Sequence, residues 1–171
     1  MVFRPAMAGP LRQLAGILLH AQHTLSQGER EPISTYVSSL NGCNYRCTVH
    51  GYTAGSRLGG EVVTRPIADP ERAPISEKLR VLLPIAARVQ GGGKCVAAGD
   101  VERARRLEAT DLEIHAMVLV AAAFCMYNRY VDGLAAWDPG DEQIYRDVAN
   151  RVVKVGYTRP GWEKPFAEAK P

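Results

Sequence analysis

The sequence predicts an all-α fold, a compact single-domain bundle of about six or seven helices. Apolar residues recur three and four positions apart along most of the chain, strand-like alternation is nowhere sustained, and no internal repeat or low-complexity tract is present. The chain has 171 residues, of which 46% are hydrophobic and 23% are charged. One domain of this size can bury a core without disulfide bonds.

Two amphipathic helices are expected near the N-terminus. Leu11, Leu14 and Leu18 share one face of the first helix, and Ile33 and Val37 share one face of the second. This spacing is typical of helices that bury one side.

A helix over 75–86 and a short helix from Asp100 to Leu107 are expected next. Pro84 lacks a backbone donor, so we expect it to kink or shorten the first of these. Asp100 is a suitable N-terminal cap for the second.

The strongest helix signal is the capping box of Thr110 and Glu113, which opens a helix that we expect to run to about Trp137. The unbroken apolar run 116–126 within it is well short of the roughly 20 residues that a membrane span needs. We therefore interpret it as a buried helix. Asp141 starts a last amphipathic helix.

Three regions follow from these elements: an N-terminal lead (1–9), a helical domain (10–157) and an extended C-terminal arm (158–171). The arm is rich in proline, which argues against another helix. It carries Trp162 and Phe166, whose side chains need an apolar surface such as that of a neighbouring subunit.

Charge and cysteine usage limit the classes of partner and compartment. The 21 Lys and Arg residues exceed the 18 Asp and Glu residues by three, too small and too scattered an excess for a surface that binds nucleic acid or an anionic membrane. No segment is a convincing secretion signal, so we expect a cytoplasmic protein. In a reducing compartment, four cysteines with only two close together favour redox or metal chemistry over a disulfide framework.

Cys43, Cys47 and His50 share one helical face if Asn41 caps a helix that begins at Gly42. The first turn of a helix stabilises a thiolate, and a histidine one turn away can exchange its proton, so the pattern predicts a redox pair with at least one lowered thiol pKa. Two alternatives stay open. The residues are small buried cysteines with a core histidine, or they form a zinc site, for which no fourth ligand is evident.

Other candidate residues are more typical of structural roles. Cys125 lies within the apolar helix and is expected in the core, whereas Cys95 follows a glycine-rich loop and is expected to be an exposed thiol. His115 lies in the first turn of a capped helix, and His20 and His23 look like ordinary residues of an amphipathic helix.

Glu31 is followed after eleven residues by Cys43, and His50 lies seven residues further on. This spacing resembles the alkyl hydroperoxidase D-like, peroxidase-related branch of the carboxymuconolactone decarboxylase superfamily, whose usual pattern is Glu-x11-Cys-x2-Cys-x3-His. The resemblance covers about residues 10–157, and the other segments that carry it are 28–31, 36–41, 111–115 and 124–134. It implies an all-α fold and a homo-oligomer, a trimer or a hexamer. It also implies that Glu31 and His50 relay protons and that Cys43 is the first cysteine of the pair.

The resemblance is imperfect at the second cysteine. Arg46 occupies the position of that cysteine, and Cys47 stands one residue later, some 100° further round a helix. Tyr45 occupies the position that holds an additional relay histidine in some members. Beside a thiolate, the charge of Arg46 is expected to lower the pKa of the thiol.

Three functional hypotheses follow. The leading one is a thiol-dependent peroxidase that reduces hydroperoxides through Cys43 and Cys47 and is reset by an external thiol or disulfide reductant, with no cofactor or metal. The second is a lyase like the carboxymuconolactone decarboxylases, in which cysteines are not the working groups. The third is a non-catalytic oligomeric binding protein.

Overall fold

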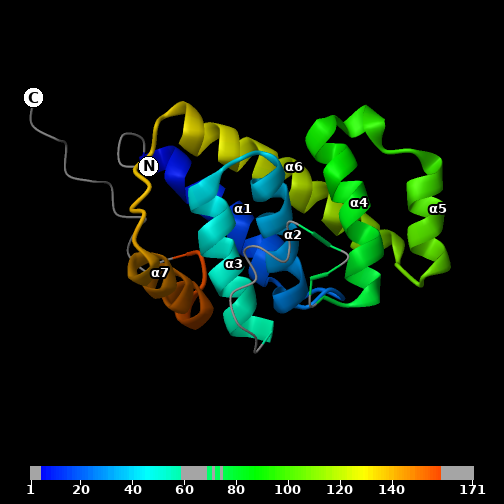
Figure 1. Ribbon diagram of the computed structural model, residues 1–171, viewed down its shortest axis with the longest axis horizontal. Coiled ribbons are helices and arrows are strands. Elements are labelled where there is room, and N and C mark those ends of the chain that lie inside the picture. The colour runs from blue at the N-terminus through cyan, green and yellow to red at the C-terminus, as the bar shows by residue number, and fades with distance from the viewer. Residues whose placement is uncertain (1–4, 59–68, 71, 74, 159–171) are drawn as a thin grey trace, which may run out of the picture.

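The computed structural model describes residues 5–58, 69–70, 72–73 and 75–158, and it contains helices and no strand within them. The prediction of an all-α bundle is therefore confirmed (Figure 1). The elements of this part of the chain are α1 (Pro5–His20), α2 (Gln27–Leu40), α3 (Asn44–Leu58), α4 (Glu77–Gly91), the 3-10 helix η2 (Gly93–Cys95), α5 (Ala98–Arg106), α6 (Asp111–Gly133) and α7 (Glu142–Val155).

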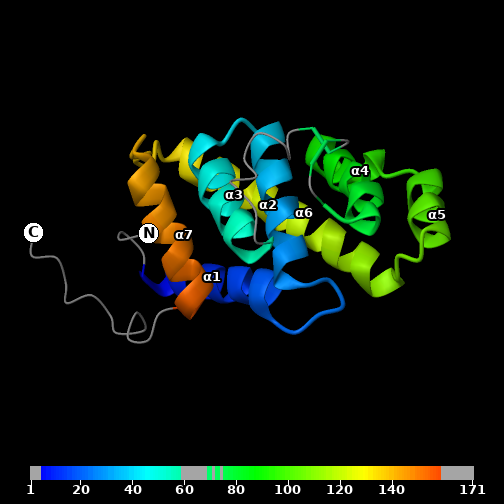
Figure 2. The ribbon, with the colours of Figure 1, turned by 60° about the horizontal axis from the view of Figure 1, so that its bottom comes forward.

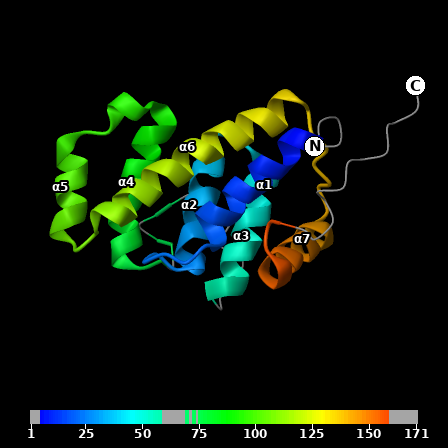
Figure 3. The same ribbon diagram turned by 180° about the vertical axis from the view of Figure 1, so that it is seen from behind.

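The long helix α6 organises the domain. Seen from behind, it runs along most of the molecule, with α1 beside it and with α4 and α5 at one end (Figure 3). Helix α2 packs against α3, α4 and α6, and α7 lies beside α3 at the other end (Figure 2). The core between α2, α4 and α6 consists of fully buried aliphatic and aromatic side chains, among them Ile33, Val37, Leu82, Leu83, Ile85, Met117, Val120 and Phe124.

Within the described residues, α6 is long and apolar enough to cross a membrane by length and composition. Half of its most apolar stretch is nevertheless buried against the rest of the fold, a pattern that the core helices of globular domains share. Its other face exposes Leu112, Leu119 and Met126. Such a face is available to another copy of the chain, and the oligomeric state stays a prediction.

Capping residues define several helix starts as the sequence indicates. Thr110 and Glu113 form the predicted capping box at the start of α6, and Asp141 caps α7. Asp100 differs from the prediction, because Ala97 is the N-cap of α5 and the Asp100 carboxylate accepts the Ala97 N–H at 3.1 Å from inside the first turn.

The start of α3 contradicts the prediction. Asn41 is the C-cap of α2 and not the N-cap of the next helix. Gly42 then adopts a φ of 68°, in the left-handed region that glycine tolerates, so the chain turns before the new helix begins at Asn44. Cys43 stands just before α3, and its carbonyl accepts the Cys47 N–H at 3.0 Å.

Three other boundaries differ from expectation. Helix α4 continues through Pro84 to Gly91, so the proline does not shorten it. Helix α6 ends at Gly133, before the expected Trp137, and Ala135 has a positive φ of 46°. Helix α1 begins at Pro5, within the segment expected to be the N-terminal lead. Of the C-terminal arm, residues 159–171, which include Trp162 and Phe166, lie outside the described residues.

Candidate functional site

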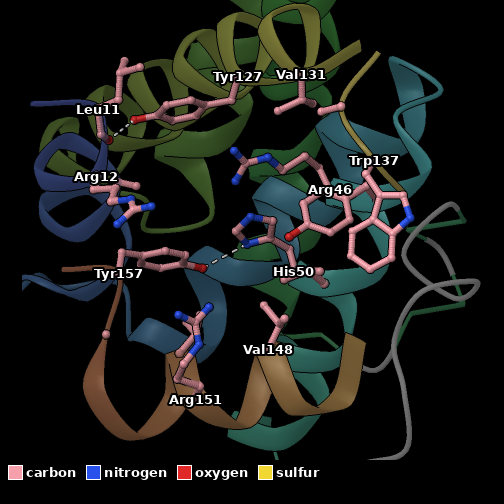
Figure 4. A pocket seen from close by; sticks show the side chains of 16 residues that line it. Leu11, Arg12, Arg46, His50, Tyr127, Val131, Trp137, Val148, Arg151 and Tyr157 are labelled. Atoms are coloured by element: carbon pink, nitrogen blue, oxygen red, sulfur yellow. Dashed lines mark hydrogen bonds between the residues drawn. The ribbon is translucent and has the colours of Figure 1, made fainter. Parts of the chain in front are cut away.

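Three side chains that are far apart in the sequence form a buried hydrogen-bonded cluster. His50 Nδ1 lies 2.8 Å from Glu31 Oε2. The Tyr157 hydroxyl lies 2.9 and 3.1 Å from the two Glu31 carboxylate oxygens. It also lies 3.0 Å from His50 Nδ1, the contact that Figure 4 marks with a dashed line. Glu31 and His50 are 0% exposed. The structure thus brings together two residues that the sequence predicts and a tyrosine that it does not.

Local structure places each member of this cluster. Glu31 lies on the buried side of α2, and His50 lies near the middle of α3, which packs on α2. Tyr157 follows directly after α7, where Gly156 adopts a φ of 75° that favours glycine. A Cβ atom at Gly156 would lie 3.3 Å from His20 Nδ1, so the turn is also closely packed.

His20 belongs to the surroundings of the cluster, which corrects its interpretation as an ordinary helix residue. Its Nε2 lies 3.6 Å from Glu31 Oε1, and its ring meets the Tyr157 ring edge to face at 4.8 Å. Arg57 Nη2 lies 3.0 Å from His20 Nε2. His23 stays outside, where its Nδ1 accepts the N–H of Leu25.

The Glu31 carboxyl is ionised at neutral pH. Burial by itself raises its pKa, because a buried charge loses its hydration. The surrounding groups of His20, His50 and Tyr157 outweigh burial and lower the pKa of Glu31 to about 2. The cluster is therefore built around a carboxylate and the donors that face it.

The two partners of this carboxylate are uncharged at neutral pH. Burial lowers the pKa of His50 from its ordinary value of 6.5, although the hydrogen bond and the charge of Glu31 act in the opposite direction. Burial and then the charge of Glu31 raise the pKa of Tyr157 well above 10. At pH 7 the cluster consists of a carboxylate, a neutral imidazole and a protonated phenol.

These charge states fix the tautomer of His50. Nδ1 faces an ionised carboxylate oxygen at 2.8 Å, and the phenol donates its single proton to the same carboxylate, so Nδ1 must carry the imidazole proton. Nε2 then presents a lone pair. It is buried and has no hydrogen-bond partner among the described residues. An unpaired acceptor of this kind is suited to take a proton from a ligand.

His50 and Tyr157 are also among the residues that line a cavity of about 380 Å³ between α1, α3, α6 and α7. The described residues of its lining include basic and aromatic side chains and no aspartate or glutamate. Figure 4 shows several of these side chains around one space. The polar and aromatic lining residues are Arg12, Tyr45, Arg46, His50, Tyr127, Trp137, Arg151 and Tyr157.

Arg46 is a central part of this lining. Its guanidinium lies over the Tyr127 ring, with Cζ at 5.4 Å from the ring centroid, and its buried Nε has no hydrogen-bond partner in the described part of the chain. Tyr127 donates its hydroxyl proton to the Leu11 carbonyl at 2.6 Å, which holds the ring in place. Tyr45, the other residue predicted to support the site, also lines the cavity.

The two cysteines predicted as a redox pair do not line the cavity. Cys43 is 1% exposed, and burial raises its pKa to about 11. Burial also raises the pKa of Cys47, which is partly buried. The predicted lowering of a thiol pKa is therefore wrong, because loss of hydration is the largest effect at both thiols. Neither thiol is in a disulfide bond.

Three other candidates lie outside the cluster and the cavity lining. Cys125 is partly buried and packs against the core, Cys95 is exposed, and His115 is exposed on α6. Among the described residues, no group of three or more His, Cys, Asp or Glu side chains is arranged to hold a metal ion.

Comparisons with known proteins identify the fold. No protein-family model and no curated protein matches the chain. An uncharacterized peroxidase-related protein from Silicibacter sp. TM1040 is 27% identical, with a TM-score of 0.71 over 80% of this chain and 71% of that chain. The alkylhydroperoxidase AhpD core of an uncharacterized peroxidase-related protein from Ralstonia eutropha JMP134 is 24% identical, with a TM-score of 0.75 over 84% of this chain and 77% of that chain. The chain thus has the fold of the AhpD-like superfamily, as the sequence resemblance predicts.

Several cavity residues carry no signal that sequence reasoning detects. Tyr157, Arg12 and Arg151 come from separate segments, and no motif links any of them to Glu31 or His50. Arg46 is a cavity residue outside the Glu31–His50 motif whose position in the sequence was unusual. It replaces the second cysteine of the family pattern, and its side chain lines the cavity beside His50.

Proposed function

We propose that the protein is an acid–base enzyme in which His50 moves a proton to and from a substrate in the cavity, without cysteine oxidation. This is the lyase hypothesis that the sequence leaves open. The observation that carries it is the unpartnered Nε2 of His50, because that atom belongs to a residue of the cavity lining. Cys43 and Cys47 are not among the residues that line the cavity.

The geometry supports His50 as a general base and not as a general acid in the resting enzyme. The lowered pKa keeps the imidazole neutral at pH 7, so Nε2 is free to accept a proton. The Glu31 carboxylate at 2.8 Å from Nδ1 stabilises the imidazolium that forms. Tyr157 donates to that carboxylate and holds it in place. A positioned base of this kind contributes roughly 10²- to 10⁴-fold to a rate.

The proposed step breaks a C–H bond of the substrate. The proton goes to His50 Nε2, and the electron pair stays on the substrate, where an adjacent carbonyl group takes it up as an enolate. The protonated His50 then returns the proton to another carbon, which completes an isomerisation. In a decarboxylation, CO2 leaves the substrate, a solvent proton that His50 has taken up on Nε2 goes to the carbanion, and the neutral imidazole is restored.

A thiol peroxidase is the second candidate, and one observation favours it. The two similar structures named above belong to proteins described as peroxidase-related, and Cys47 lies one turn before His50 on α3. The Cys47 thiolate would attack a hydroperoxide oxygen, release an alcohol and become a sulfenic acid. The Cys43 thiol would condense with it to a disulfide and water, and an external dithiol would reduce the disulfide. The raised pKa values of both thiols oppose this candidate.

Two parallel assays separate the candidates. The first follows deuterium incorporation and CO2 release by NMR in D2O, with a panel of small 2-oxo, 3-oxo and unsaturated carboxylic acids. The second follows consumption of cumene hydroperoxide with dithiothreitol as reductant. Both assays use the natural protein, His50→Gln and the double variant Cys43→Ser/Cys47→Ser.

We expect deuterium incorporation with the natural protein and the double cysteine variant, and none with His50→Gln. The proposal is wrong if the natural protein consumes hydroperoxide, the double cysteine variant does not, and no acid in the panel exchanges a proton. That outcome would establish the thiol peroxidase instead.

A further inference from the structure

We infer that His20 is a positioning residue that regulates the basicity of His50 through Glu31. When His20 takes up a proton from a second cavity, it exchanges Arg57 for Glu31 as its hydrogen-bond partner. This inference rests on the proposed function, because it names the regulation of the same site. His20 and Arg57 both lie outside the sequence motif that contains Glu31 and His50.

One buried carboxylate faces two histidines from different helices. His50 Nδ1, on α3, lies 2.8 Å from Glu31 Oε2, and His20 Nε2, at the end of α1, lies 3.6 Å from Glu31 Oε1. The two rings thus approach opposite oxygens of a single negative charge. That charge balances one protonated ring, so a second protonated ring beside it is repelled by the first.

A second cavity brings solvent to one of the two histidines. This cavity has a volume of about 670 Å³ and lies between α1, α3 and α7, and its described lining includes His20, Arg57 and Tyr157. The side chain of His20 is 16% exposed, whereas those of Glu31 and His50 are 0% exposed. His20 is therefore the histidine of this arrangement that meets solvent protons, and it does so in a cavity that His50 does not line.

Nε2 of His20 lies between a donor and an acceptor. Arg57 Nη2 lies 3.0 Å from it, and a guanidinium only donates, so Nε2 accepts this bond while the ring is neutral. A proton on Nε2 removes the lone pair that accepts from Arg57. The new N–H then faces Glu31 Oε1, and a small rotation or one bridging water closes the distance of 3.6 Å. The two hydrogen-bond patterns exclude each other because they use the same atom.

The surroundings of His20 favour this exchange of partners. The charged and titratable groups that surround His20 or share the second cavity with it are Arg30 and Glu31 of α2, His50 and Arg57 of α3, Lys154 of α7, and Tyr157. Among these groups only Glu31 is negatively charged, so a protonated His20 is drawn to it. Arg57 keeps a partner after the exchange, because its Nη1 donates to Gln27 Oε1.

A positive charge on His20 makes His50 a weaker base. Burial is the main cause of the lowered pKa of His50, and a charge on His20 lowers this pKa further. The coupling is reciprocal, so protonation of His50 also disfavours protonation of His20. While His20 is neutral, Glu31 is left to stabilise the His50 imidazolium that forms when a substrate gives up its proton. The second cavity thus regulates the base of the first.

NMR titration of the histidine rings tests the inference. The chain has four histidines, so the signals lost in His23→Gln, His50→Gln and His115→Gln assign three rings and leave the fourth to His20. The test variant is His20→Gln, because an amide accepts from Arg57 and donates to Glu31 but does not titrate. A second variant, Arg57→Gln, removes the donor that competes for Nε2. His115→Gln is the matched control, since this histidine is exposed on α6. Circular dichroism verifies folding.

We expect the titration midpoint of His50 to rise by at least about 0.5 pH unit in His20→Gln. The midpoint of His20 should rise by at least about the same amount in Arg57→Gln. Both midpoints should stay unchanged in His115→Gln. If His20 only packs against its neighbours, His20→Gln lowers stability and leaves the His50 midpoint where it was.

The inference is overturned if neither His20 nor His50 titrates at a higher pH once the other is replaced by glutamine. It is also overturned if His20 titrates in Arg57→Gln as it does in the natural protein. If His20→Gln does not fold, the Arg57→Gln variant decides alone.

These midpoints are measured without turnover, which separates this inference from the proposed function. Coupled titration of the two rings, with no proton exchange from any acid in the panel, would support the inference and count against the acid–base enzyme. Proton exchange that needs His50, together with ring midpoints that do not respond to His20→Gln, His50→Gln or Arg57→Gln, would leave the enzyme intact and overturn the inference.

Discussion

Substitution of the central carboxylate, Glu31→Gln, is the most informative perturbation of the buried cluster. The amide is close in size to the carboxyl group, so packing is preserved while the charge is removed. It cannot ionise, and it loses the charge-assisted hydrogen bonds that the carboxylate accepts from His50 and Tyr157. We therefore expect the variant to fold with lower stability at neutral pH.

The lowered pKa of Glu31 gives the size of the effect. Its pKa falls from an ordinary value of 4.5 to about 2 in the folded protein. At about 1.4 kcal/mol per pKa unit, ionisation of this group contributes about 3 kcal/mol to the free energy of unfolding at pH 7. Because the folded-state pKa is the lower one, the contribution is present above pH 4.5 and is lost as the pH falls toward 2. At pH 3 less than about half of it is left.

The assay is urea unfolding at several pH values between 7 and 3, for the natural protein, Glu31→Gln and the control Glu102→Gln. Glu102 is exposed on α5. The difference between the natural protein and Glu31→Gln should be about 3 kcal/mol at pH 7 and should shrink below pH 4.5. A difference that is the same at pH 7 and pH 3, or no larger than that of the control, would refute the assignment of Glu31 as a buried carboxylate.

Three further predictions concern the working groups. Turnover should rise with pH along an acid limb whose midpoint lies below 6.5 and stay level above it, because neutral His50 is the active form and its pKa is lowered; a pH–rate profile that falls from pH 5 to pH 7 would contradict this. Iodoacetamide should label Cys95 before Cys43 and Cys47, because Cys95 is exposed and burial raises the pKa of the other two; peptide mass spectrometry over time tests the order, and early labelling of Cys47 would favour the peroxidase. Tyr157→Phe should lower the free energy of unfolding by about 1 to 3 kcal/mol and slow turnover, since the Glu31 carboxylate loses a donor; unchanged values in urea unfolding and in turnover would remove Tyr157 from the cluster.

The fold class could be predicted from the sequence because it depends on local patterns, namely helical periodicity and helix caps. Helical periodicity located the helices, and the capping box of Thr110 and Glu113 marked the start of α6 correctly. The prediction of the helix start failed where a single glycine reverses the direction of the backbone. The left-handed turn at Gly42 ended one helix and began another, so the helical wheel placed Cys43 inside a helix that starts at Asn44.

Part of the candidate site could be predicted because two of its residues belong to a local sequence pattern. Glu31 and His50 came from a motif with fixed spacing, and the structure places them in contact. Tyr157 is 126 residues from Glu31, and that contact depends on how α7 packs against α3, which no local pattern encodes. The raised pKa of Cys43 also depends on burial by distant segments, whereas the sequence shows only the neighbouring residues and the helix start.

The protonation of His50 at neutral pH is the most direct test of the central claim that this residue is a general base in the cavity. Long-range proton–nitrogen NMR of the histidine rings, with the His50 signals assigned by their loss in His50→Gln, reports which ring nitrogen carries the proton. We predict a neutral ring at pH 7 with the proton on Nδ1 and a bare Nε2, and a titration midpoint below 6.5. A ring that is doubly protonated at pH 7, or one that carries its proton on Nε2, would contradict the account.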